Sequence, residues 1–74
     1  MVSVGEFVRL KRKRLGVTQV TLADKAGVGL RFLRELEMGK PSLQMDKVNQ
    51  VLMLFGAELG PVPLNRERIL NAQG

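Results

Sequence analysis

The stretch from Thr18 to Lys40 constrains the fold most, because it contains two short helical patterns separated by a turn of only three residues. Thr18 can cap a helix that begins near Gln19, since its hydroxyl oxygen can accept a hydrogen bond from a backbone N–H of the first turn. The turn is Gly27-Val28-Gly29, and glycine suits the positive φ angle that a chain leaving a helix often needs. The spacing therefore predicts a helix, a tight turn and a second helix.

The second helix is predicted from Leu30 to Met38, where Gly39 and Pro41 end it. Leu33 and Leu36 recur at helical spacing and should face inward. The outward residues should be Arg31, Arg34 and Glu35. Taken alone, this pattern also fits an ordinary helical hairpin whose arginines are only a solvated surface.

A helix before this pair is predicted from the capping-box spacing of Ser3 and Glu6, and it should continue to Leu15 and end at Gly16. The basic run from Lys11 to Arg14 is distributed around the helix, so most of it should be solvated. The residues expected to cover the helix pair are Val4, Val8 and Leu15, with Phe7 and the aliphatic part of Lys11.

A further helix is predicted from Gln44 to Phe55, closed by Gly56. Its expected apolar stripe consists of Met45, Val48, Val51, Leu52 and Phe55, which we assign to the core. Met53 and Leu54 add apolar surface on a second flank. Such a flank on so small a domain suggests contact with a second subunit.

The chain changes character after Gly56. Residues 57–64 contain two prolines and a glycine, which favours a short edge strand or an extended arm over a helix. Asn65 to Gly74 is polar and should be a single helical turn or disordered. The sequence thus predicts an all-α fold of four to five short helices in residues 1–56, followed by a C-terminal arm in residues 57–74.

Composition limits the function classes. The chain has 74 residues, enough for one domain, and contains neither cysteine nor histidine. Disulfides and the usual zinc-ligand sets are therefore excluded, and we expect no metal and no cofactor. Its acidic residues are scattered rather than paired, and the G-x-G at Gly27 follows no strand. We therefore expect no enzymatic activity.

The net charge of +5 favours an anionic partner. No run of about twenty apolar residues predicts a membrane span, and no secretory signal is present, so a cytoplasmic protein is expected. Three phenylalanines and no tyrosine or tryptophan leave no set of aromatics on which single-stranded bases could stack. Double-stranded DNA is therefore the preferred partner.

Particular residues resemble a known family. Gln19, Leu22-Ala23, Ala26-Gly27-Val28 and Leu36-Glu37-x-Gly39 resemble, in order and spacing, the Xre or lambda-repressor-like helix-turn-helix family. The resemblance implies a nucleoid-associated DNA-binding regulator. Residues 45–48 and 54–59 are similar to the HipB-type antitoxin branch, in which the segment after the last helix pairs with its twin in a homodimer.

This branch implies an antitoxin that represses its own operon and binds a HipA-type kinase toxin. A stand-alone Xre regulator without a toxin stays open, as does a protein-interaction module that does not bind DNA. In the resembled family, the residues that match Arg12 and Glu37 form a structural ion pair, and the glutamine that matches Gln19 holds a DNA phosphate.

The mechanism implied by the resemblance places the helix that begins at Leu30 in the major groove. Leu30 stands where many relatives have a polar residue, so base preference does not carry over to this chain. The expected DNA-contacting residues are Thr18, Gln19, Leu30, Arg31, Arg34, Glu35, Lys40 and Ser42. The expected partners are double-stranded operator DNA and a second copy of the chain.

Overall fold

The computed structural model describes residues 3–63 and contains four α-helices: α1 (Val4–Leu15), α2 (Gln19–Ala26), α3 (Leu30–Glu37) and α4 (Met45–Met53). No strand is present among the described residues. The predicted all-α fold is therefore confirmed. The expectation of a helical turn or disorder in residues 65–74 lies outside the described residues. Within residues 3–63, no helix has both the length and the apolar character needed to cross a lipid bilayer.

Local hydrogen bonds determine where the first two helices begin and end. The Ser3 hydroxyl accepts a hydrogen bond from the Glu6 N–H at 3.2 Å, and the Thr18 hydroxyl accepts one from the Thr21 N–H at 3.1 Å. Both helices end at a glycine in the left-handed region, Gly16 with φ 70° and Gly27 with φ 73°. A side chain with a Cβ is disfavoured at this φ, so glycine permits each turn.

The last two helices are slightly shorter than predicted. Helix α3 ends at Glu37, and α4 ends at Met53 rather than Phe55. After Met53 the backbone forms tighter i→i−3 hydrogen bonds, from the Phe55 N–H to the Leu52 carbonyl at 2.9 Å and from the Gly56 N–H to the Met53 carbonyl at 3.1 Å. The apolar pattern continues through this turn, and for that reason it overestimates the length of α4.

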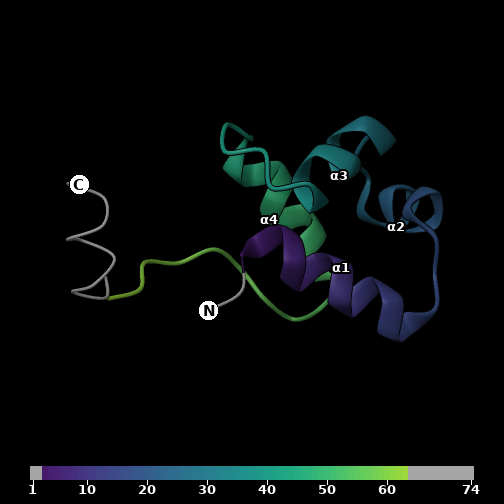
Figure 1. The fold of residues 1–74 in the computed structure, drawn as a ribbon, viewed down its shortest axis with the longest axis horizontal. Helices are drawn as coiled ribbons and strands as arrows, with labels where there is room; N and C mark the ends of the chain where they lie inside the picture. Colours follow the sequence, from purple (N-terminus) through teal and green to yellow (C-terminus); the bar gives the residue numbers. More distant parts are fainter. Residues whose placement is uncertain (1–2, 64–74) are drawn as a thin grey trace.

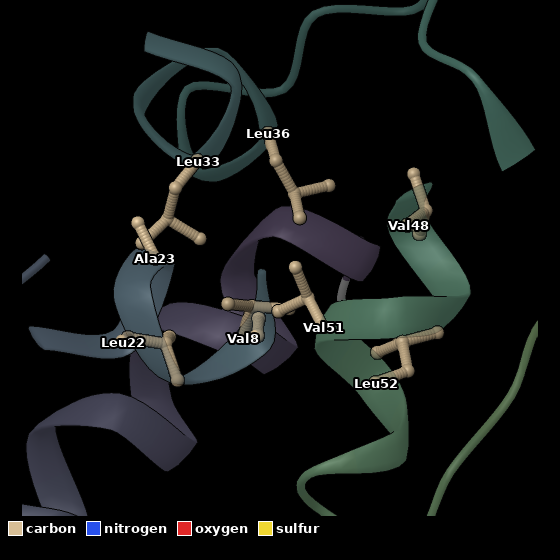
Figure 2. Packing of buried hydrophobic residues seen from close by; sticks show 9 residues of the cluster. Val8, Leu22, Ala23, Leu33, Leu36, Val48, Val51 and Leu52 are labelled. Atoms are coloured by element: carbon tan, nitrogen blue, oxygen red, sulfur yellow. The ribbon is translucent and has the colours of Figure 1, made fainter. Parts of the chain in front are cut away.

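In the ribbon view α1 runs beneath α2 and α3, and α4 lies to the left of α2 (Figure 1). The chain after α4 passes the N-terminal end of α1 as an extended segment. The core lies between the four helices, where the apolar side chains point toward one another (Figure 2). Its buried residues are Val8, Leu22, Ala23, Ala26, Leu33, Leu36, Val48, Val51 and Leu52. The inward positions predicted at Val8 of α1, at Leu33 and Leu36 of α3, and at Val48, Val51 and Leu52 of α4 are confirmed.

Two residues predicted for the core are exposed. Leu15 is 63% exposed and Met45 is 68% exposed. Leu15 belongs to the last turn of α1, which has 12 residues and is about 18 Å long, whereas α2 and α3 have eight residues each and are about 12 Å long. Met45 is the first residue of α4. Helical spacing gives the direction of a side chain but not whether a neighbouring element extends far enough to cover it.

The extended segment after α4 is fixed to that helix. The Leu59 N–H donates a hydrogen bond to Asn49 Oδ1 at 2.7 Å, and Ala57 and Leu59 pack against the core. Phe55 contacts Phe7 edge to face, with ring centroids 6.5 Å apart and an interplanar angle of 81°. Residues 57–63 therefore follow α4 as an extended arm whose first residues pack against the domain.

Helices α1 and α3 cross at Gly5, which is buried. A Cβ atom at this position would overlap the backbone carbonyl oxygen of Leu36. The missing side chain thus lets the start of α1 lie directly against the last turn of α3.

Gly5→Ala is expected to destabilise the domain. Because the overlap is with backbone atoms, forcing the two helices apart should cost about 2–3 kcal/mol, the upper part of the range for overpacking. The better helix propensity of alanine returns at most about 1 kcal/mol, so a net loss is expected. Thermal unfolding followed by circular dichroism measures the loss. The control is Gly60→Ala, because Gly60 lies outside the helices, its φ is not positive and a Cβ there meets no atom within 4 Å. Equal melting temperatures for Gly5→Ala and the wild type would contradict the close crossing.

Candidate nucleic-acid interface

Helix α3 presents two faces. Leu33 and Leu36 are buried in the core, whereas Arg31 and Arg34 are exposed, with the Arg31 side chain 94% accessible. The short Gly27–Gly29 connection places α3 directly after α2. The helix therefore lies at the surface with two cations pointing to solvent, as the sequence predicted.

The first residues of α3 are less open than expected. Gly29 is the N-cap with φ −70° and forms no side-chain cap, so the first turn lacks the hydrogen bond that a serine would supply. Leu30 is partly buried. Only part of its side chain could contact a ligand.

Glu35 joins two of the predicted site residues. Its Oε1 accepts a hydrogen bond from Arg31 Nε at 3.1 Å, and its Oε2 accepts one from Lys40 Nζ at 2.7 Å. The hydrogen bond from Lys40 is the main reason that the pKa of Glu35 is lowered, and the bond from Arg31 contributes in the same direction. The sequence predicted the three residues as separate contacts, although Arg31 and Glu35 have the i,i+4 spacing that places side chains together on a helix.

Arg12 and Glu37 form the ion pair that the resemblance implied. Arg12 donates from Nε to Glu37 Oε2 at 2.8 Å and from Nη2 to Oε1 at 3.0 Å, and its Nη1 donates to the Val17 carbonyl at 3.1 Å. The side chains are only 14% and 4% exposed, respectively. The hydrogen bonds to Glu37 raise the pKa of Arg12. This two-point contact joins α1 to the last turn of α3.

Gln19 belongs to the same cluster. Its Nε2 donates a hydrogen bond to Glu37 Oε1 at 3.1 Å. The family resemblance assigned this amide to a DNA phosphate, and nothing in the sequence indicated the bond to Glu37. One amide N–H of Gln19 is therefore occupied within the protein, and a phosphate contact would have to use its other N–H or the backbone at the start of α2.

The other predicted contact residues lie at the ends of the helix pair. Thr18 caps α2, and its hydroxyl also donates to Thr21 Oγ1 at 3.1 Å. Lys40 and Ser42 are exposed in the connection between α3 and α4. Lys40 and Arg31 lie next to each other, because both contact Glu35. Gln19 lies apart from them, beside Glu37.

Two further cations lie beside the Glu37 cluster and were missed in the sequence. Arg9 and Lys13 of α1 line a shallow surface depression together with Gln19 and Met38. The sequence indicated only that the run from Lys11 to Arg14 is solvated. The i,i+4 spacing of Arg9 and Lys13 was the signal that could have identified a common face.

Arg12→Ala is expected to lower the stability of the domain by about 3–5 kcal/mol, because it leaves the nearly buried Glu37 carboxylate without its guanidinium partner. Circular dichroism melting measures this change. Arg14→Ala removes the same charge from an exposed position of α1 and should change stability by no more than about 0.5 kcal/mol. An Arg12→Ala protein that melts with the wild type would contradict a structural role.

Comparisons with known proteins agree with this geometry. The family model described as Helix-turn-helix matches residues 8–61. The chain is 48% identical to the uncharacterized HTH-type transcriptional regulator y4mF of Sinorhizobium fredii over 56 residues. These residues make up 76% of this chain and 74% of that protein. No solved structure matches the chain. The HipB-type branch stays a prediction, and the chain itself belongs to the helix-turn-helix family.

Proposed function

We propose that the chain is a sequence-specific DNA-binding transcriptional repressor that inserts α3 into the major groove. The observation that carries the proposal is the exposure of Arg31 and Arg34 on a helix whose opposite face is fixed in the core. Membership of the helix-turn-helix family and the relative named as a transcriptional regulator support it. The +5 charge of the chain is suited to a polyanion.

The dimensions of α3 fit this role. Its eight residues give a rod about 12 Å long, and the major groove of B-DNA admits one α-helix. Arg34 forms no ion pair with any residue from 3 to 63, so its guanidinium is available to a base edge or a phosphate. Arg31 keeps its terminal nitrogens available, because only its Nε contacts Glu35.

Phosphate contacts would come from both sides of α3. The start of α2 offers the backbone N–H groups of its first turn next to Thr18 and Gln19, where the helix dipole also favours an anion. Lys40 and Ser42 follow the end of α3 and are exposed. In this arrangement the phosphate contacts position the protein, and the arginines on α3 supply discrimination between bases.

Arg34→Ala is expected to weaken binding to the preferred duplex by about 1–3 kcal/mol if Arg34 contacts a guanine, and to relax the preference at one base position. The preferred duplex is first selected from a random DNA pool, and affinities are measured by mobility shift across a salt series. Arg14→Ala is the charge-matched control on α1. Wild-type affinity that does not change with salt would exclude DNA as the partner and favour a protein-interaction module, since phosphate binding releases counterions.

We also propose that the chain acts as a symmetric homodimer. A single domain with one short helix in the groove buries little surface, and twofold dimers bind two half-sites about one helical turn apart. Met53 and Leu54 are exposed in the single chain. Their apolar side chains are therefore available to contact a second subunit. The backbone of the arm supplies a second surface for the partner.

The two edges of the arm differ. In an extended chain, successive residues direct their N–H groups to opposite edges. On one edge the Leu59 N–H is occupied by Asn49, and Pro61 and Pro63 have no N–H. On the other edge, the N–H groups without a hydrogen-bond partner within residues 3–63 belong to Glu58, Gly60 and Val62. This single open edge suits pairing with the same segment of a second copy.

Gly60→Pro is expected to weaken dimerisation, because it removes one N–H from the open edge. Gly60→Ala is the matched control: it keeps the N–H, the φ of Gly60 is not positive, and a Cβ at this position meets no atom within 4 Å. Sedimentation equilibrium measures both dissociation constants. A dimer unaffected by proline would exclude pairing through this edge, and a wild-type monomer at all concentrations would exclude the dimer itself.

A finer function, that of a HipB-like antitoxin with a HipA-type kinase partner, is favoured by the arm and by the resemblance of residues 45–48 and 54–59. We expect co-expression with a kinase encoded beside this chain to give a stable complex that represses the shared promoter more strongly than the chain alone. Repression that is complete without the kinase, together with no complex on size exclusion, would instead select the stand-alone regulator.

A further inference from the structure

We propose that Glu35 acts as a positioning residue for specificity: it holds Arg31 and Lys40 in the free protein and thereby limits binding to DNA of unrelated sequence. The inference rests on the proposed function, since it concerns how α3 distinguishes one duplex from another. Glu35 is a carboxylate between two cations. Neither protein stability nor attraction to DNA explains an anion at this position.

The geometry makes Glu35 the fixed member of the group. Its side chain is 26% exposed, whereas that of Arg31 is 94% exposed, so the cation has the greater freedom to move. Each carboxylate oxygen is used once, with Oε1 bonded to Arg31 and Oε2 bonded to Lys40. A single anion thus engages two of the three cations that α3 and the following turn direct toward DNA, and leaves Arg34 as the third.

Stability does not explain this arrangement. Ion pairs with solvent-exposed partners contribute little to stability, because water and salt screen them and the side chains lose freedom. In addition, the Arg31–Glu35 pair has the cation on the N-terminal side, which is the less favourable order for an i,i+4 pair in a helix. Removing the charge should therefore leave the fold intact, and its effect should be found in DNA binding.

The carboxylate affects unrelated and preferred sequences differently. Unrelated DNA is bound through phosphates, and each cation that leaves Glu35 for a phosphate gives up a charge-assisted hydrogen bond. On a preferred duplex the loss is smaller, because Arg31 can stay bonded to Glu35 through Nε and still present its two terminal nitrogens as a fork. That fork can donate to the O6 and N7 acceptors of a guanine. Glu35 thus penalises phosphate binding while it pre-orients the base contact.

The test compares Glu35→Gln with the wild type on the selected operator duplex and on an unrelated duplex of equal length. Asp24→Asn is the control, because it changes the net charge equally at an exposed position of α2 that the proposed contacts do not include. We expect Glu35→Gln to bind the unrelated duplex more tightly and with a salt slope steeper by about 0.9 for each additional phosphate that the variant neutralises. The ratio of operator to unrelated affinity should fall about fivefold, the lower end of the discrimination that one base pair supplies.

A second comparison shows whether Glu35 acts through the two cations. In an Arg31→Ala/Lys40→Ala background, the tighter binding caused by Glu35→Gln should largely disappear. If the full effect persisted, Glu35 would act only as a repelling charge, and the inference would be overturned. Wild-type protein gives an independent readout: the NMR signal of the Arg31 Nε–H should keep its hydrogen-bonded position on the operator and shift away from it on the unrelated duplex.

Loss of the Glu35 effect and loss of DNA binding would give different results. If the wild type binds DNA and responds to salt, but Glu35→Gln and Asp24→Asn give the same affinity ratio, the role of Glu35 is excluded and the proposed function stands. If the wild type binds no duplex at any salt concentration, the proposed function fails and this inference fails with it. Thermal melting of Glu35→Gln checks that the variant is folded in each comparison.

Discussion

The contact between Arg12 and Glu37 is the interaction on which the rest of the structure depends. It takes two charges largely out of water, which is costly unless every polar atom has a partner. The guanidinium meets this condition with two bonds to the carboxylate and one to the Val17 carbonyl, and Gln19 supplies a further donor to Glu37. The cluster joins α1, the start of α2 and the end of α3. The orientation of the exposed face of α3 therefore depends on the contacts of Glu37 with α1 and α2.

Helix α3 uses its two carboxylates in opposite ways. Glu35 and Glu37 are two residues apart and so project about 200° from each other around the helix. Glu37 is 4% exposed and is held by groups from two other helices, whereas both cations around Glu35 reach solvent. A buried ion pair whose polar atoms all have partners is costly to break, whereas the members of an exposed ion pair exchange partners easily. The same residue type thus fixes the scaffold on one face and leaves exchangeable cations on the other.

An extended segment with unpaired backbone N–H and C=O groups can pair with other chains, and the arm limits this pairing to one edge. Asn49 occupies the Leu59 N–H, and the two prolines remove further donors from the same edge. Only the opposite edge keeps donors that lack partners within the described chain. An extended segment with one usable edge can pair once, which suits a closed dimer and disfavours open-ended assembly.

The sequence by itself determined where α1 and α2 begin and end, because Ser3, Thr18, Gly16 and Gly27 act through backbone groups only three to five residues away. It also determined most of the core, since a 3.6-residue period separates inward from outward positions. Tertiary structure alone decided that Leu15 and Met45 are exposed, and that the Gln19 amide bonds to Glu37. These outcomes depend on how far neighbouring helices extend and where their side chains meet. Such distances are set by the packing of all four helices together, and no local pattern contains them.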